Sequence, residues 1–182
     1  MKKMFLSTLL YLLNSVATNA QITQATLQAS GLTCAMCAKS IHTNLTSLGF
    51  VESIDTDLNA SAFVILFKKG APVDLDALAK KVEDAGFSVA TLKINALFKQ
   101  QNIEPDAHVE LDGNLYHFVN VKPQQLSGPI VLRVIDQHFV SAKEFKKLNA
   151  LTKMECMKTR RADASCAAYG IEQGRRVYHL TL

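Results

Sequence analysis

Two cysteines with two residues between them, Cys34 and Cys37, have the spacing with which a chain can hold a metal ion or exchange disulfides. Before them, apolar and polar residues alternate from Gln24 to Ser30, which predicts a half-buried strand. After them, apolar residues recur every three or four positions and predict a helix with one buried stripe, Ala38, Ile41, Leu45 and Leu48. The thiols are therefore expected at a helix N-terminus, where the helix dipole favours the thiolate, the form that binds metal or attacks disulfides.

The N-terminus has the order of a secretory signal peptide. Lys2 and Lys3 precede an apolar run from Met4 to Leu13, and a more polar stretch with small residues leads to Ala20. The run is shorter than the roughly 20 residues that span a bilayer, and no later segment approaches that length. We expect residues 1–20 to be a signal peptide and the mature chain to be periplasmic or secreted, with no membrane span.

Length and charge divide the rest of the chain into two domains. About 160 residues remain, more than one typical small domain needs. Residues 21–96 carry six Lys or Arg against seven Asp or Glu, whereas residues 97–182 carry twelve against nine. The basic excess lies mainly in one stretch, Lys143, Lys146, Lys147, Lys153, Lys158, Arg160 and Arg161. Acidic residues interrupt that stretch and export removes the chain from most nucleic acid, so we interpret it as a solvated surface.

The order of predicted elements in residues 21–96 is β-α-β-β-α-β. Val51–Leu58 and Ala62–Phe67 have strand patterns. Asp74 is placed to cap a second helix, which ends at Gly86 and has Leu75, Leu78, Val82 and Ala85 on its inner face. A last strand alternates at Ala90, Leu92 and Ile94. This order is ferredoxin-like: two helices cover one face of an antiparallel sheet.

Residues 21–96 resemble the heavy-metal-associated domain, the family of copper chaperones, copper-pump N-terminal domains and the periplasmic mercury-binding protein. That family's mark is Gly-Met-x-Cys-x-x-Cys on the first loop, matched from Gly31 to Cys37 with Leu32 in place of Met. Two flanking blocks, Gly49–Leu58 and Val82–Phe87, are also similar, and the resemblance covers about 75 residues. Leu for Met conserves volume, so we expect the site to be intact.

The resemblance implies that Cys34 and Cys37 bind one Cu(I) ion, with Hg, Ag or Zn as other thiophilic ions. Two thiolates leave the ion unsaturated, so a thiol of a metal-donating or metal-accepting partner, such as a metal transporter, can enter before the first ligands leave. Metal-loop support is expected from Gly31, Thr33, Met36 and Phe87, with Met36 packing or facing solvent rather than ligating. The alternative is an intramolecular Cys34–Cys37 disulfide, which an oxidising compartment favours.

Residues 97–182 are predicted from local patterns alone. Polar residues suggest a linker over residues 97–106, and strands at His108–Leu111 and Leu115–Val121 flank an Asp-Gly hairpin turn. Further patterns predict a strand at Ile130–Ile135, a helix capped by Ser141 and Glu144, and a C-terminal strand. The predicted fold class is thus α+β, with a ferredoxin-like βαββαβ domain followed, at residues 107–182, by a small β-rich domain of unknown family with one helix. A barrel-like arrangement is one option for that second domain.

Cys156 and Cys166 are predicted to form a structural disulfide, worth about 2–4 kcal/mol. A second soft-metal cluster with Met154 and Met157, or two free thiols, is the alternative. The histidines are interpreted as surface or partly buried residues rather than ligands, because none forms a close ligand pair: His42, His108, His117, His138 and His179.

Three functions remain open on the sequence. The first is a metal carrier or scavenger with no catalytic residues. The second is a thiol–disulfide oxidoreductase, disfavoured because the chain has no Trp, whereas thioredoxin-like motifs resemble Trp-Cys-x-x-Cys, and because its element order differs. The third is an interaction module in residues 97–182, for which the first domain is a metal-dependent dock. No nucleic-acid partner is expected.

Overall fold

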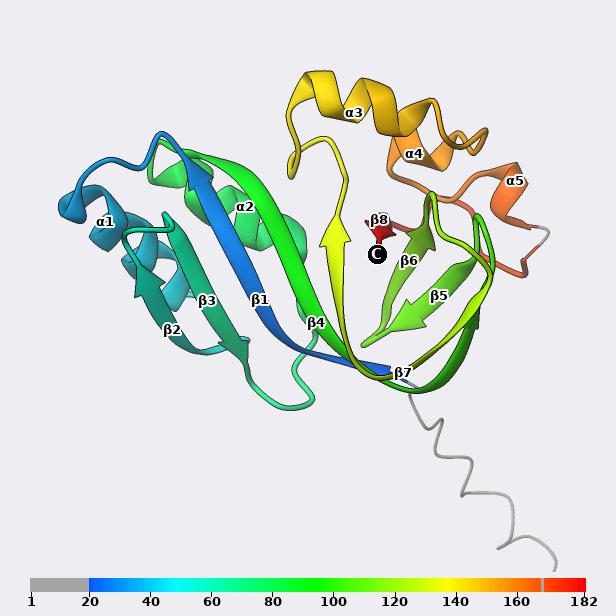
Figure 1. Cartoon of the computed structure of the whole chain (residues 1–182), viewed down its shortest axis with the longest axis horizontal. Coiled ribbons are helices and arrows are strands. Elements are labelled where there is room, and N and C mark those ends of the chain that lie inside the picture. The colour runs from blue at the N-terminus through cyan, green and yellow to red at the C-terminus, as the bar shows by residue number, and fades with distance from the viewer. Residues whose placement is uncertain (1–19, 168) are drawn as a thin grey trace, which may run out of the picture.

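One open sheet of eight strands runs through the described chain in the order β2-β3-β1-β4-β7-β8-β6-β5. The structure is a computed structural model that describes residues 20–167 and 169–182 (Figure 1). Residues 1–19 of the predicted signal peptide lie outside the described residues. Within the described part of the chain, no helix has the length and apolar character to cross a membrane.

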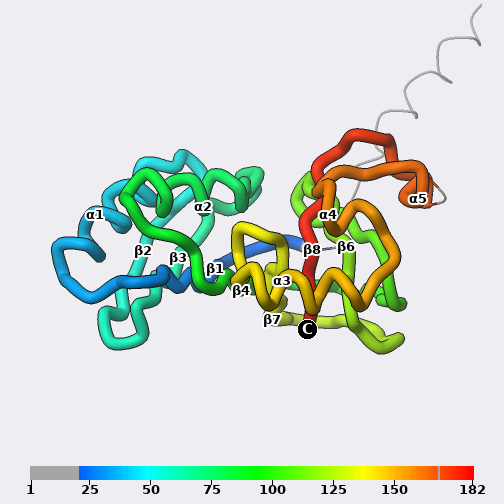
Figure 2. Tube along the Cα trace, turned by 90° about the horizontal axis from the view of Figure 1, so that it is seen from above, coloured from blue at the N-terminus to red at the C-terminus, as the bar shows by residue number. Residues whose placement is uncertain are grey.

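The first half has the predicted ferredoxin-like order. Its elements are β1 (Ala20–Ser30), α1 (Ala35–Thr46), β2 (Val51–Asp57), β3 (Ala62–Phe67), α2 (Leu75–Asp84) and β4 (Ser88–Ile103). The four strands pair antiparallel in the order β2-β3-β1-β4, and both helices lie on one face of them (Figure 2). The predicted cap is present, because Asp74 Oδ1 accepts a hydrogen bond from the Ala77 N–H at 3.0 Å.

The two helices cover the sheet through the predicted apolar stripes. Ile41 and Leu45 of α1, and Leu78 and Val82 of α2, are fully buried in the main core. Opposite them, every second residue of the central strands is buried, as in Leu92 and Ile94 of β4, together with Ala25, Leu27, Phe63 and Ile65. These contacts hold the loop between β1 and α1 at one end of the sheet.

The predicted linker at residues 97–106 is wrong for most of its length. β4 continues to Ile103, and its second part pairs with β7 (Gln124–Val134) from Leu97 opposite Pro129 to Ile103 opposite Gln124. Lys99 and Gln100 are polar because they are exposed at a register shift of this strand, whereas Phe98 and Ile103 are buried. The predicted boundary between two domains therefore falls inside a strand, and the main core includes residues from both halves.

The second half extends the same sheet and is not closed into a barrel. The predicted hairpin is present as β5 (His108–Leu111) and β6 (Asn114–Phe118), and β8 (Val177–Thr181) lies between β6 and β7. β8 is parallel to β6 and antiparallel to β7, while β2 and β5 are the two ends of the strand order. The separate barrel-like domain predicted for residues 107–182 is therefore not confirmed, because its strands continue the eight-stranded sheet, whose end strands do not pair.

The described second half contains three helices where the sequence predicted one. α3 (Ala142–Asn149) is the predicted helix, and Ser141 Oγ accepts from the Glu144 N–H at 3.2 Å. α4 (Cys156–Thr159) and α5 (Ala164–Ala167) are single turns that carry Cys156 and Cys166 into a small buried cluster with Leu115, Ala162 and Val177. Four residues are too few to show a helical period, so the sequence pattern did not reveal these two turns.

A polar cluster fastens α2 to the second half of the chain. Asp76 of α2 accepts from Nε of Arg176 at 2.8 Å and forms an ion pair with Arg160. Arg176 also contacts Asp136 at 3.3 Å and lies over the Tyr178 ring at 4.0 Å. Arg160, which the sequence analysis placed on a solvated basic surface, is thus mostly covered and paired.

Candidate metal sites

The Cys34–Cys37 loop lies where β1 ends and α1 begins, as predicted. Gly31 has φ +73° and turns the chain away from the strand. Cys34 is the N-cap of α1, and its Sγ accepts a hydrogen bond from the Cys37 N–H at 3.1 Å. The first turn of α1 has no acidic side chain, so no carboxylate in that turn weakens the stabilisation that the positive end of the helix dipole gives to a negative charge on this sulfur.

Cys34 and Cys37 are joined in a disulfide, with Cα atoms 5.3 Å apart. This is the oxidised state that the sequence analysis gave as the alternative to a loaded metal loop. Cys34 is exposed and Cys37 is half-buried, so a reductant can reach the bond from solvent. Reduction would leave two thiols at the end of a helix, the arrangement that stabilises thiolates for soft metals.

The residues expected to support the loop occupy two different environments. Phe87, like Leu32, is partly buried and packs against the main core, and the Leu32 carbonyl accepts from Ser61 Oγ at 3.3 Å. Thr33 is exposed, and Met36 is 74% exposed, in agreement with the prediction that Met36 packs or faces solvent. Leu32 and Phe87 thus pack against the core, whereas Thr33 and Met36 face solvent.

A second group of chemically competent side chains lies at the opposite end of the sheet. His108 of β5 pairs in register with His117 of β6, and His117 pairs with His179 of β8, so three histidines form a row across adjacent strands. The rings of His108 and His117 stack with centroids 4.6 Å apart, and the His117 and His179 rings meet edge to face at 5.2 Å. His117 and His179 are fully buried.

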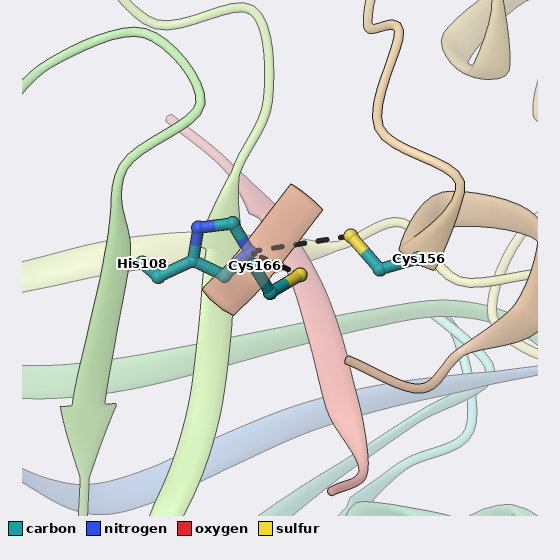
Figure 3. A group of neighbouring side chains, drawn as sticks. All are labelled: His108, Cys156 and Cys166. Atoms are coloured by element: carbon teal, nitrogen blue, oxygen red, sulfur yellow. Dashed lines mark hydrogen bonds between the residues drawn. The ribbon is translucent and has the colours of Figure 1, made fainter. Parts of the chain in front are cut away.

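Cys156 and Cys166 face this row, and both are free thiols, so the predicted disulfide between them is wrong. Their sulfurs are turned toward imidazole nitrogens: Cys166 Sγ lies 3.6 Å and Cys156 Sγ 4.0 Å from His108 Nε2 (Figure 3). Cys156 Sγ also lies 3.7 Å from His117 Nδ1. Met157 is buried in a different cluster, beside Val119, Ile135 and Val140.

Carboxylates hold the outer nitrogens of two of the histidines. Asp106 Oδ1 lies 2.9 Å from His117 Nε2, and Asp136 Oδ1 lies 2.6 Å from His179 Nδ1. Burial and then the neighbouring histidines lower the pKa of His117 to about 4, and burial also lowers the pKa of His108. Both imidazoles are therefore neutral at neutral pH.

The Cys156 thiol differs in character from the loop cysteines. Burial, and next the neighbouring Cys166, raise its pKa well above the ordinary range. Cys156, His117 and Asp106 are linked in space in the order thiol, imidazole and carboxylate, as in a nucleophile with its base and the group that orients the base. A protonated sulfur that solvent cannot reach is nevertheless a poor nucleophile. His117 and His179 are fully buried, so their interpretation as surface or partly buried residues is wrong, whereas His108 is partly buried as predicted.

Comparison with known proteins concerns the first half of the chain. The heavy-metal-associated domain matches residues 26–88. A probable copper-exporting P-type ATPase of Archaeoglobus fulgidus is 35% identical over 66 residues, which are 36% of this chain and only 8% of that protein. The copper chaperone CopZ of Bacillus subtilis is 31% identical over 67 residues, or 37% of this chain and 96% of the chaperone.

Among solved structures, a CopZ metallochaperone is similar at 22% identity and a TM-score of 0.35, over 37% of this chain and 100% of that one. The sequence matches carry the assignment, because nearly the whole of the Bacillus subtilis chaperone aligns with the segment that bears Cys34 and Cys37. Through residues 26–88, this chain belongs to the heavy-metal-associated domain family.

Proposed function

We propose that the chain carries or scavenges one Cu(I) ion, bound between Cys34 and Cys37 after their disulfide is reduced, and exchanges that ion with a partner protein. The observation that carries the proposal is the placement of both thiols on an exposed loop at the N-terminus of α1. That loop belongs to a domain whose relatives include a copper chaperone and a probable copper-exporting ATPase.

The partner in this proposal is a metal donor or acceptor such as a metal transporter. An ion held by two thiolates keeps room for a third, so a partner's thiol can bind before either loop cysteine leaves. Exposure of Cys34 and of the neighbouring Met36 gives a partner direct access to the ion. Zn, Ag and Hg are other ions that two thiolates accept.

Export to the periplasm or beyond belongs to the same proposal and is supported by the signal-like order of residues 1–20. An oxidising compartment favours the disulfide, so the protein would have to receive metal before oxidation or meet a reductant. Labelling the N-terminus of protein isolated from the cell envelope tests this part. A first residue at position 21 supports export, and an intact Met1 in the cytoplasm contradicts it.

Equilibrium dialysis of the reduced chain against Cu(I) tests the proposed binding. Binding of one ion that is lost in Cys34→Ser and kept in Met36→Ala is the expected result, because the two sulfurs supply the ligands. Met36→Ala is a matched control, since it alters the same loop without removing a thiolate. Equal Cu(I) affinity in the Cys34→Ser variant would refute the proposal.

A second candidate function is thiol–disulfide exchange through the same pair, which the disulfide at a helix N-terminus favours. Insulin reduction separates the two functions. Turnover that disappears in Cys37→Ser would identify an oxidoreductase, whereas its absence in a chain that binds Cu(I) would leave the carrier.

A further inference from the structure

The ligand atoms of His108, Cys156 and Cys166 are already spaced for one metal ion. All three lie within 4.8 Å of one another, and the two nitrogen-to-sulfur distances from His108 Nε2 are 3.6 and 4.0 Å (Figure 3). An ion bound at about 2.3 Å from sulfur and about 2.0 Å from nitrogen separates those ligands by roughly 3.5–3.8 Å. The Cys166–His108 distance already fits this separation, and the Cys156 sulfur would have to move toward His108 by about half an ångström.

His117 is the nearest further ligand on the side of Cys156, and its ring would have to move toward Cys166 and His108 to complete the shell, because its ligand atom now groups with Cys156 and His179. Its Nδ1 lies 3.7 Å from Cys156 Sγ, again the separation of two ligands of one ion. Its Nε2 is held by Asp106 at 2.9 Å, which leaves Nδ1 toward the thiol. A carboxylate on the outer nitrogen of a histidine is a recurring feature of metal sites because it fixes the ring and raises its basicity.

A buried polar atom beside this group has no partner in the described part of the chain. His179 Nε2 is buried and has no hydrogen-bond partner in the described structure, although Asp136 holds its other nitrogen. His117, Cys156 and His179 form a second group of ligand atoms within 4.8 Å, which shares Cys156 with the first. A buried donor or acceptor without a partner costs about 1–3 kcal/mol, which makes His179 the alternative to His117 as a further ligand beside Cys156.

Charge selects the kind of ion. Two thiolates and two neutral imidazoles carry two negative charges, which a divalent ion cancels and a monovalent ion does not. Cys156 and Cys166 are fully buried, where an uncancelled charge is costly. Zn(II) accepts two sulfurs and two nitrogens in a tetrahedral shell. His108, the least buried of these residues, is partly exposed, and the exposed ring of Tyr169 lies 5.2 Å from its ring.

We propose that Cys156, Cys166, His108 and His117 bind a divalent thiophilic ion, Zn(II), in a buried site separate from the Cys34–Cys37 loop. The two sites lie at opposite ends of the molecule, one at the start of α1 and the other beside α4 and α5 (Figures 1 and 2). The loop site is exposed and suited to exchange. The second site is mostly buried, with only His108 partly exposed, would take its ligands from β5, β6, α4 and α5, and would fasten these two helical turns to the sheet.

Metal titration of the reduced full chain carrying Cys34→Ser and Cys37→Ser tests this proposal without interference from the loop. We expect one Zn(II) per chain, and Co(II) used as a probe should give thiolate-to-metal absorption and the intense bands of a tetrahedral ion. Zn(II) should also protect two thiols from alkylation. Adding Cys166→Ser should remove the absorption and weaken Zn(II) binding more than tenfold, whereas His138→Ala, an exposed histidine, should leave both unchanged.

Asp106→Asn gives a test that removes no ligand. Asp106 is partly exposed and has φ +58°, a conformation that Asn tolerates, so this variant is expected to fold. Weaker support of His117 should lower Zn(II) affinity by about tenfold. Folded protein that binds no Zn(II), binds only Cu(I), or retains full Zn(II) affinity in Cys166→Ser would overturn the proposal, as would a native Cys156–Cys166 disulfide found by mass spectrometry.

Discussion

Asp76→Asn is expected to weaken the attachment of α2 to the second half of the chain. Asp76 is the shared carboxylate of Arg160 and Arg176, and Arg176 reaches it with Nε at 2.8 Å and Nη2 at 3.0 Å. Asn keeps the shape of the side chain but removes the charge. Two guanidinium groups would then lie against α2 with only Asp136 nearby as a carboxylate partner of Arg176.

The burial of the three side chains sets the expected loss. Asp76 is 38% exposed, while Arg160 and Arg176 are 24% and 23% exposed. Removing one partner of a fully buried pair costs about 3–5 kcal/mol, whereas exposed pairs contribute about 0.2–1 kcal/mol. Partial exposure and the remaining hydrogen-bonding capacity of Asn place the expected loss of unfolding free energy between these limits, at about 2 kcal/mol.

The loss should depend on pH in a defined direction. Burial by itself would raise the pKa of Asp76, but the hydrogen bond and charge of Arg176, and the charge of Arg160, bring it below its ordinary value of 3.8. A lowered pKa in the folded state stabilises the fold above the unfolded-state pKa, and this contribution disappears as pH falls through the folded-state value. The difference between the two proteins should therefore be complete at neutral pH and shrink below pH 3.8.

Urea unfolding followed by circular dichroism measures this difference. Asp84→Asn is the matched control, because Asp84 lies on the same helix and pairs only with exposed Lys80, at 3.0 Å. We expect the control to change the unfolding free energy by less than about 0.5 kcal/mol. Equal effects of the two substitutions, or a loss at Asp76 that does not shrink at low pH, would refute the assignment of the ion pairs.

Two further predictions concern the loop and its helix. Leu45→Ala should lower the unfolding free energy by about 2–5 kcal/mol because this side chain is fully buried on the inner face of α1, whereas Met36→Ala should change little. Similar urea midpoints for the two variants would contradict this packing. Gly31→Ala should cost about 1 kcal/mol because φ is +73° although the space is open. Gly49, which lacks a positive φ and also has open space, is its control in thermal unfolding; no difference between the two alanine variants would show that Gly31 is not required by conformation.

The predictable part of the fold is the part with local signals. Asp74, Gly86 and the apolar stripes of α1 and α2 act within a few residues of themselves, and each had the predicted role. The segment after Leu97 could not be assigned in this way, because β4 continues there through pairing with β7, some 21 to 32 residues later in the chain. Polar composition at Lys99 and Gln100 indicated exposure correctly, but exposure is compatible with a strand as well as with a linker.

The two cysteine pairs show the same limit at the level of sites. Cys34 and Cys37 are close in sequence and sit between recognisable blocks, so their loop was predictable. The second group depends on register: His108 faces His117 across the β5–β6 hairpin, but His117 faces His179 only because β8 enters the sheet between β7 and β6. The predicted hairpin brings together residues nine positions apart, whereas no local pattern indicates that residues 62 positions apart become lateral neighbours.

The two cysteine pairs of this chain differ in chemistry because one pair lies near the surface and the other is buried. Under the proposals for the two sites, a reduced thiol at the exposed N-terminus of α1 is stabilised as a thiolate and can exchange its metal, whereas Cys156, buried beside Cys166, keeps its proton until a metal displaces it. A metal held there by ligands from β5, β6, α4 and α5 would be released only when α4 and α5 leave the sheet. The proposed loop ion can exchange and the proposed second ion cannot, because the backbone places one pair of sulfurs at the surface and the other pair in the interior. The second half of the chain would then serve the first half as a stable extension of its sheet.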